Sequence, residues 1–575
     1  MSYTITLSDV KKQFTLDQDK ILPPEETVKR FKAKLNRIDL DILKDTIRID
    51  NGRLNIPIYF STCGKDAAAV IGTKKQMGKG GTPDQAEASA VMELAERFSF
   101  FSFAANPDNF FIDTHQNVKQ EAIPFDLIAK SVHDESDDLK ISRKIFENLP
   151  LKWTRAYNLT REKEVLIPFD WFFSINEFNG PSAGNCIEEA LIQGICEIVE
   201  RHTSSIVSHQ KLKVPAIRPA SASDPLVVEM LAKYKNAGIN LFLSDFSLDT
   251  GIPTVGVLAY DPATFPYLSE IVWTAGTTPH PQKALSRALT EVAQLAGDFN
   301  TGSNYVASGL PKFKNLAEAG YIIQPDREIN VQELPDISDS NLKTEVLNCI
   351  SALASNKMEV LSINTIHSQL EIPAFYTIIP GAHFRERSLG TSVAMFSAKH
   401  IYENRSPEKA VLELRNIDTI LPGKYFIQFY LGAANLALHN PRTGLVHLRQ
   451  ALTLEPTAQD IPSIYSYIGV ALKDMGEYRQ ALENLQEGEK LDNRRTDIYN
   501  LMGFCHFKLK EHEKAIENFK KVIDIDPSSA IDYANIASNY RQMGEKHKAI
   551  QYYQTALDLD PTIQFAQEQL QDLLR

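Results

Sequence analysis

The strongest constraint on the fold is a sequence period of 34 residues towards the C-terminal end. Ala481, Ala515 and Ala549 follow one another at this interval. A small residue stands twelve positions before each alanine, and a proline stands twelve positions after the last two. The small residues are Gly469, Gly503 and Ala537, and the prolines are Pro527 and Pro561. Small residues let paired helices approach closely and proline ends a helix, so each unit predicts a helix hairpin.

An earlier, less regular copy of the unit contains Gly432, Gly444 and Pro456, offset by three extra residues around 458–460. About four hairpins, an all-α solenoid, are therefore predicted over residues 421–575. The pattern resembles the tetratricopeptide repeat, and this resemblance implies a partner protein bound on the concave face. The residues that match its signature are Tyr499, Met502, Gly503, Ala515, Phe519 and Pro527, then Tyr533, Tyr540, Tyr553 and Pro561.

Composition excludes several classes of protein. A net charge of −12 disfavours a nucleic-acid surface, and no run of apolar residues is long enough to cross a membrane. The first twenty residues lack the apolar core of a signal peptide, so a cytoplasmic location is expected. Five scattered cysteines form no CxxC pair, which argues against a disulfide framework or a zinc ribbon.

The residues before the repeats, 1–410, form a separate predicted domain, because 575 residues exceed one hydrophobic core. Predicted helices alternate here with strand-like runs at residues 53–60, 254–260 and 375–379, which indicates an α/β or α+β fold.

Three predicted helices in this domain carry polar residues at helical spacing. The first follows Thr82, a predicted N-cap, and Pro83; the second follows Asn185, also a predicted cap; the third follows Pro281. The polar residues are Ser89, Glu93, Glu96 and Arg97 on the first, Glu189, Gln193, Glu197, Glu200 and Arg201 on the second, and Arg287, Glu291 and Gln294 on the third.

The sequence Glu-x-x-Glu-Arg occurs in both the first and the second helix. Exposed i,i+4 ion pairs would explain it, but apolar neighbours such as Val91, Leu94 and Ile198 leave little solvent-like surface. Carboxylates that converge with arginines suit Mg²⁺ and phosphate oxygens, so a nucleotide site is the better explanation. It is not a Walker P-loop, because the segment ending at Lys79 has the wrong spacing and Gly80 replaces the required Ser or Thr.

These motifs resemble the YcaO family, whose ATP site combines a Ser-x₃-Glu-x₂-Glu-Arg helix, an Asn-led helix with spaced glutamates and an Arg-x₃-Glu-x₂-Gln helix. The pair Lys20 and Thr27, seven residues apart, also resembles the family. The resemblance implies Mg²⁺ ligands at Glu93, Glu96, Glu189, Glu197 and Glu200. It implies ATP contacts at Lys20, Thr27, Ser89, Arg97, Asn185, Gln193, Arg201, Arg287, Glu291 and Gln294.

The resemblance further implies ATP-dependent activation of a peptide amide, in which the amide oxygen is phosphorylated and leaves as phosphate. No catalytic serine or cysteine is required, so Cys186 is interpreted as a packed thiol and the catalytic residues stay unassigned. Residues 570–575 lack the Pro-x-Pro-x-Pro tail common in azoline-forming members, which disfavours that reaction. With its repeats, the chain instead resembles accessory factors of ribosomal-protein methylthiolation or thioamide-forming members.

Two alternatives stay open at this stage. One is a non-catalytic scaffold that binds ATP while the repeats assemble other proteins. The other is a ligase that activates a free carboxylate. A peptide or protein substrate is expected if the chain is an amide-activating enzyme. Dimerisation is an expectation from the resemblance alone.

Overall fold

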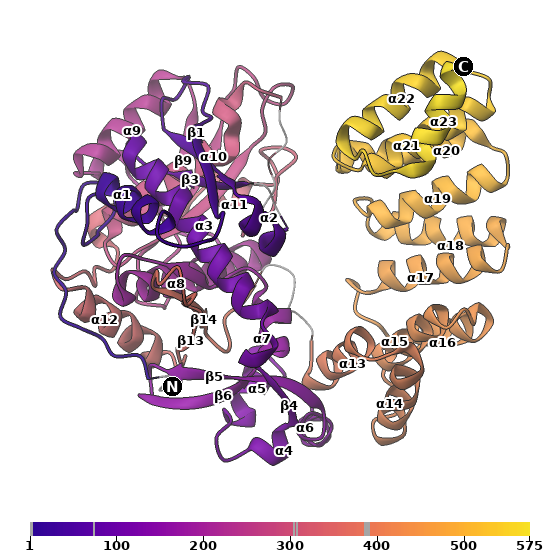
Figure 1. Ribbon diagram of the computed structural model, residues 1–575, viewed down its shortest axis with the longest axis horizontal. Helices are drawn as coiled ribbons and strands as arrows, with labels where there is room; N and C mark the ends of the chain where they lie inside the picture. Colours follow the sequence, from indigo (N-terminus) through magenta and orange to yellow (C-terminus); the bar gives the residue numbers. More distant parts are fainter. Residues whose placement is uncertain (1–3, 73–74, 303–304, 306–308, 385–390) are drawn as a thin grey trace. The chain divides into compact units, whose positions relative to one another are not determined.

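The computed structural model describes residues 4–72, 75–302, 305, 309–384 and 391–575. Its internal packing divides the chain into two compact units (Figure 1). The first unit comprises Met1–Leu139 and Phe146–Val393, and the second comprises Lys140–Ile145 and Ala394–Arg575. The assignment of residues 1–410 and 421–575 to two functional domains stays a prediction.

The first unit contains mainly antiparallel sheets. One sheet has the order β1 (Leu43–Arg48), β2 (Ile58–Cys63), β3 (Lys75–Lys79). A second has the order β11 (Val272–Thr277), β10 (Thr254–Tyr260), β9 (Asn240–Asp245), β8 (Ala216–Ile217), β12 (Glu328–Ile329). The third has the order β4 (Phe111–Thr114), β5 (Pro150–Asn158), β13 (Leu361–Asn364), β14 (Ala374–Ile378), β7 (Pro181–Ala183), and β6 (Lys163–Pro168) pairs with β5.

Helices cover these sheets, and the longest two begin directly after β3 and β7. The helices are α1 (Pro24–Leu35), α2 (Lys65–Ile71), α3 (Pro83–Ala105), α4 (His115–Val118), α5 (Phe125–Ser131), α6 (Leu139–Glu147, shared with the second unit), α7 (Phe169–Asn176), α8 (Ile187–Gln210), α9 (Pro225–Asn236), α10 (Pro281–Ala296), α11 (Gly320–Ile323) and α12 (Leu342–Ser355). Both α3 and α8 pack against β7 and β14, whereas α10 packs against β10 and β11. Among the described residues, no helix combines the length and apolarity needed to span a membrane.

Two of the three predicted strands are present as β10 and β14, but the prediction for residues 53–60 is wrong over its first half. The strand β2 starts only at Ile58, after Pro57, which has no N–H to give to a ladder. Asn55 has a φ of 50°, which also interrupts an extended strand. Arg53 instead turns inward and forms an ion pair with Asp261 at 2.7 Å.

The second unit is a run of helices that pair in sequence order (Figure 1). After α13 (Val393–Asn404) and α14 (Pro407–Ile420) come four hairpins and a last helix. The hairpins are α15 (Tyr425–Ala437) with α16 (Pro441–Thr453), α17 (Ile461–Asp474) with α18 (Tyr478–Leu491), α19 (Thr496–Lys508) with α20 (His512–Ile525) and α21 (Ala530–Gln542) with α22 (Lys546–Leu559); α23 (Gln564–Leu574) follows.

The period of 34 residues is visible as repeated packing. Ala481, Ala515 and Ala549 are all completely buried. A Cβ on Gly503 would lie 2.7 Å from the ring of Phe519, so the close approach of α19 and α20 requires a residue without a side chain. The predicted helix hairpins are therefore present.

Candidate active site

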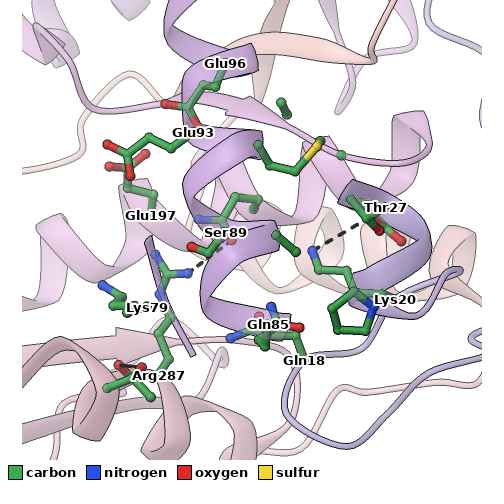
Figure 2. A pocket seen from close by; sticks show the side chains of 18 of the residues that line it. Gln18, Lys20, Thr27, Lys79, Gln85, Ser89, Glu93, Glu96, Glu197 and Arg287 are labelled. Carbon is green, nitrogen blue, oxygen red and sulfur yellow. Dashed lines mark hydrogen bonds and ion pairs between the residues drawn. The ribbon is translucent and has the colours of Figure 1, made fainter. Parts of the chain in front are cut away.

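Three helices and the N-terminal segment enclose one polar cavity of about 250 Å³ in the first unit. Figure 2 shows Ser89, Glu93 and Glu96 along α3; in this view Lys79 and Arg287 lie on one side of the helix, and Lys20 and Thr27 on the other. All of the sequence-predicted site residues line the cavity except Glu200. The fold therefore brings together side chains that lie as far apart in the chain as Lys20 and Gln294.

The starts of the helices fix this arrangement. Thr82 is the N-cap of α3, as predicted, and its hydroxyl accepts a hydrogen bond from the Gln85 N–H at 3.2 Å. The predicted cap at Asn185 is wrong, because α8 starts one residue later with Cys186 as N-cap and without a side-chain capping bond. The Asn185 amide instead donates to the Glu189 carboxylate at 3.1 Å, beside a bond from its own backbone N–H at 2.9 Å.

Glu189 is almost completely buried and its carboxylate is already well supplied with hydrogen-bond donors. Besides the bonds from Asn185, it accepts one from the Ile21 N–H at 2.7 Å, and Lys20 Nζ lies 3.9 Å away. This carboxylate thus links the N-terminal segment to the start of α8. To bind a metal ion it would have to exchange some of these donors.

Glu200 lies behind the cavity wall rather than on it. Its Oε2 accepts hydrogen bonds from the Thr277 N–H and from Arg287 Nε, both at 3.2 Å. Arg287 in turn donates from Nη1 to Gln193 Oε1 at 3.1 Å. Because Glu200 neutralises and orients Arg287, it supports a cavity residue in this structure and does not itself face the cavity.

Two carboxylates on α3 are partly buried, with Arg97 beside them. Burial raises the pKa of Glu93, although Arg97 and Lys79 act in the opposite direction. Burial raises the pKa of Glu96 well above its usual value, against the opposing effect of Arg97. Both carboxyl groups would gain from a cation close by, because a positive charge favours their ionised form.

The donor set of the cavity suits Mg²⁺. Within the described part of the chain, no three His, Cys, Asp or Glu side chains are grouped closely enough to hold a metal ion by themselves. Mg²⁺ does not require such a cage, since it usually binds through one or two carboxylates together with phosphate oxygens and water. Partly buried carboxylate oxygens beside arginines meet this requirement, so the residues present fit a magnesium–nucleotide complex.

Lys79 is the main site residue that the sequence prediction missed. It ends β3 between Gly78 and Gly80, and its ammonium group pairs with Glu291 in the cavity. A Cβ on Gly78 would lie 2.1 Å from the Ala90 backbone nitrogen, so β3 is pressed onto α3 and Lys79 is held against the site. Burial, followed by the charge of Arg287, lowers the pKa of Lys79 to about 7.

The sequence contains a signal for Lys79, namely Gly-Lys-Gly immediately before a capped helix, but this segment does not match a P-loop and so assigns the lysine no role. Gln18, Gln85 and Met77 also line the cavity and were not predicted. Gln294 Nε2 donates to Met77 Sδ at 3.5 Å. Burial raises the pKa of the Cys186 thiol to about 12, so this thiol is a poor nucleophile, as a packed thiol would be.

Comparison with known families gives two matches along the chain. Residues 77–383, more than half of the chain, match the family model described as YcaO cyclodehydratase, ATP- and Mg²⁺-binding. Residues 494–562 match a tetratricopeptide-repeat model. The predicted family, the α/β domain followed by helical repeats, and the predicted cofactors ATP and Mg²⁺ are thereby confirmed.

Curated relatives agree with this assignment. The chain is 26% identical over 380 residues to an uncharacterized protein of Methanothermobacter thermautotrophicus, a match that covers 62% of this chain and 93% of the relative. It is 27% identical over 299 residues to the ribosomal protein S12 methylthiotransferase accessory factor YcaO of Escherichia coli, covering 48% of each. The chain thus spans about half the length of the Escherichia coli protein.

Two solved structures share the fold. A heterocyclase in complex with substrate and cofactor is 21% identical with a TM-score of 0.53, covering 66% of this chain and 54% of its own. YcaO from Methanopyrus kandleri, bound with AMPPCP and Mg²⁺, is 20% identical with a TM-score of 0.50, covering 65% and 95%. From the family match and the arrangement of its three polar helices, the chain belongs to the YcaO family and carries C-terminal tetratricopeptide repeats.

Proposed function

We propose that this protein uses ATP and Mg²⁺ to activate a backbone amide of a peptide or protein by phosphorylation, and that its repeats recruit a partner or the substrate protein. One observation carries the proposal: three helices gather partly buried carboxylates and arginines around one cavity in the segment that matches the YcaO model. Such a site suits a triphosphate and its metal ions better than an uncharged ligand.

The proposed chemistry needs positioning and charge neutralisation more than a protein nucleophile. An external nucleophile, such as sulfide, adds to the amide carbon, and the carbonyl oxygen takes up the γ-phosphoryl group. Phosphate then leaves with that oxygen and the C–O bond electrons, while sulfur gives up its proton and the S–H electron pair forms the C=S double bond of a thioamide. When bound, ATP supplies this phosphoryl group and becomes ADP.

Each class of cavity residue has a role in this scheme. Glu93, Glu96 and Glu197 would hold Mg²⁺, since their carboxylates line the cavity. Arg201 and Arg287 would bind phosphate oxygens, because a guanidinium can donate two parallel hydrogen bonds to them. Lys79 would add a further positive charge next to Glu291. The remaining predicted residues, Lys20, Thr27, Ser89, Arg97, Asn185, Glu189, Gln193, Glu291 and Gln294, would surround the nucleotide, and Glu200 would support Arg287.

Calorimetric titration of Mg²⁺ and ATP tests the site directly. The double variant Glu93→Gln with Glu197→Gln keeps side-chain volume but removes two carboxylates, and its nucleotide affinity should fall by roughly tenfold or more. Glu487→Gln is the matched control, since this carboxylate is half-exposed on α18 and pairs only with Lys490 among the ion pairs of the described residues. Equal affinity in wild type and double variant, or no binding to either, would remove the proposal.

An accessory, non-catalytic role is the second candidate, and the name of the Escherichia coli relative favours it. The two candidates differ in phosphate release. Wild type incubated with Mg²⁺, ATP, sulfide and a mixture of synthetic peptides should release phosphate above a peptide-free blank if it is the enzyme. A scaffold should bind ATP yet release none, whichever peptide is added.

A further inference from the structure

The loop that joins α7 to β7 touches both of the helices that carry a Glu-x-x-Glu-Arg motif. Three consecutive residues of this loop form hydrogen bonds to side chains of the two Glu-x-x-Glu-Arg motifs. The bonds run from Arg97 Nη1 to the Phe178 carbonyl oxygen at 3.2 Å, from Arg201 Nε to Asn179 Oδ1 at 3.1 Å and from the Gly180 N–H to Glu197 Oε2 at 3.1 Å. One short segment therefore orients residues from two helices on the same cavity.

The backbone of this loop is held in one conformation. Glu177 has a φ of 47° and a ψ of −116°, a region that residues with a side chain rarely adopt. Gly180 has a φ of 102°, and a Cβ there would lie 2.3 Å from the Thr377 carbonyl oxygen. The Asn176 carbonyl oxygen accepts a bond from the Asn179 N–H at 3.0 Å. A loop so constrained gives its neighbours fixed hydrogen-bonding partners.

The side-chain amide of Asn179 has a defined orientation. Its Nδ2 donates to the Asn176 carbonyl oxygen at 2.8 Å, which leaves Oδ1 as the atom that faces Arg201. The terminal nitrogens of Arg201 lie 3.6 Å from Glu200 and 3.8 Å from Glu197, longer than hydrogen bonds. Of these three contacts, the bond from Nε to Asn179 is the only one within hydrogen-bonding distance, so Asn179 is one of the groups that hold this guanidinium.

We propose that Asn179 is a positioning residue for the nucleotide site: by holding Nε of Arg201, it turns the two terminal nitrogens towards the phosphates. The inference rests on the proposed function. Arg97, the counterpart of Arg201 in the other motif, is held by a backbone carbonyl, which no substitution removes. Of these two bonds, the one to Arg201 uses a loop side chain, so this half of the arrangement can be tested by mutation.

The test compares the affinity of the protein for Mg²⁺ with AMPPCP and for adenosine, measured by calorimetry. Asn179→Ala should weaken AMPPCP binding about tenfold, the effect of losing one hydrogen bond to a charged group, and leave adenosine binding unchanged. Asn179→Asp keeps the acceptor and should stay within about threefold of wild type. Phe178→Ala is the matched control, because it removes a side chain from the same loop but keeps the carbonyl group that Arg97 uses.

A second comparison asks whether Asn179 acts through Arg201. In an Arg201→Ala background, adding Asn179→Ala should change AMPPCP affinity less than about twofold, because the positioned group is already gone. Should Asn179→Ala fail to fold, Asn179→Ser serves the same comparison, since its side chain is too short to reach Nε. Equal losses in the Arg201→Ala and wild-type backgrounds would overturn the proposal.

The outcomes distinguish a failure of the proposed function from a failure of the positioning role of Asn179. Absence of AMPPCP binding by the wild type would remove the proposed function and this inference with it. Wild-type binding with an unchanged Asn179→Ala variant would overturn only the positioning role. A proportional loss of AMPPCP and adenosine binding would also overturn it, because that pattern indicates a general disturbance of the cavity.

Discussion

Replacing Lys79 by methionine should change how the stability of the first unit depends on pH. The Lys79 side chain is only 16% exposed. Burial, then the charge of Arg287, lowers its pKa from 10.5 to about 7 in the folded protein. The unfolded chain therefore binds more protons between pH 7 and 10.5, and the free energy of unfolding of the wild type rises with pH across this window.

The magnitude follows from the two pKa values. The folded and unfolded pKa values of Lys79 differ by about 3.5, which lowers the free energy of unfolding by about 5 kcal/mol well below pH 7. About 2 to 3 kcal/mol of this free energy of unfolding is regained between pH 6 and pH 9. The neighbouring Glu291 carboxylate favours the charged amine and reduces the effect. The wild type should thus gain about 2 kcal/mol relative to Lys79→Met between pH 6 and pH 9.

Urea titrations at the two pH values, followed by tryptophan fluorescence, measure this gain. Trp153, Trp171 and Trp273 all belong to the first unit, so the signal reports that unit alone. Lys29→Met is the control, because Lys29 is 78% exposed and should show the wild-type pH dependence. The same pH dependence in wild type and Lys79→Met would refute the argument, since Lys79 would then titrate alike in the folded and unfolded states.

Three further outcomes are expected. Glu200→Ala leaves the buried Arg287 without its counter-charge and should lower the stability of the first unit by about 3 kcal/mol in the same titration; an unchanged midpoint would contradict this support role. Gly503→Val forces a side chain against Phe519 and should destabilise the repeats by about 1 to 3 kcal/mol in a circular-dichroism melt, with the tryptophan transition as internal control. AMPPCP should raise the melting temperature of the first unit only while Mg²⁺ is present, and a rise that survives EDTA would argue against a metal-dependent site.

The sequence was sufficient to identify the faces of the site helices. A helix repeats every 3.6 residues, so steps of three and four placed Ser89, Glu93 and Glu96 on one face, and this face does line the cavity. The repeat period likewise identified the hairpins, because each unit buries the same positions against its neighbours. Both predictions depend on local spacing, which a single sequence records.

Contacts between distant segments of the chain leave no such periodic pattern in the sequence. Glu200 shares its face of α8 with Glu197, yet Arg287 from α10 and the N–H of Thr277 engage it behind the wall of the cavity. The contribution of Asn179 depends on a loop whose conformation is set by packing against β14. Such partners follow from the tertiary arrangement, which helical periodicity does not specify.

The charge of the cavity explains why nucleotide and metal ion should bind together. Among the described residues, the carboxylates that line it are Glu93, Glu96, Glu189, Glu197 and Glu291, and the cations are Lys20, Lys79, Arg97, Arg201 and Arg287. The two sets nearly balance, so a triphosphate alone would add buried negative charge without compensation, and such burial is costly. Mg²⁺ bound there would remove this excess and would also favour the ionised forms of Glu93 and Glu96, whose pKa values burial raises. On the proposed function, each ligand should therefore raise the affinity for the other by the same factor, as linkage requires.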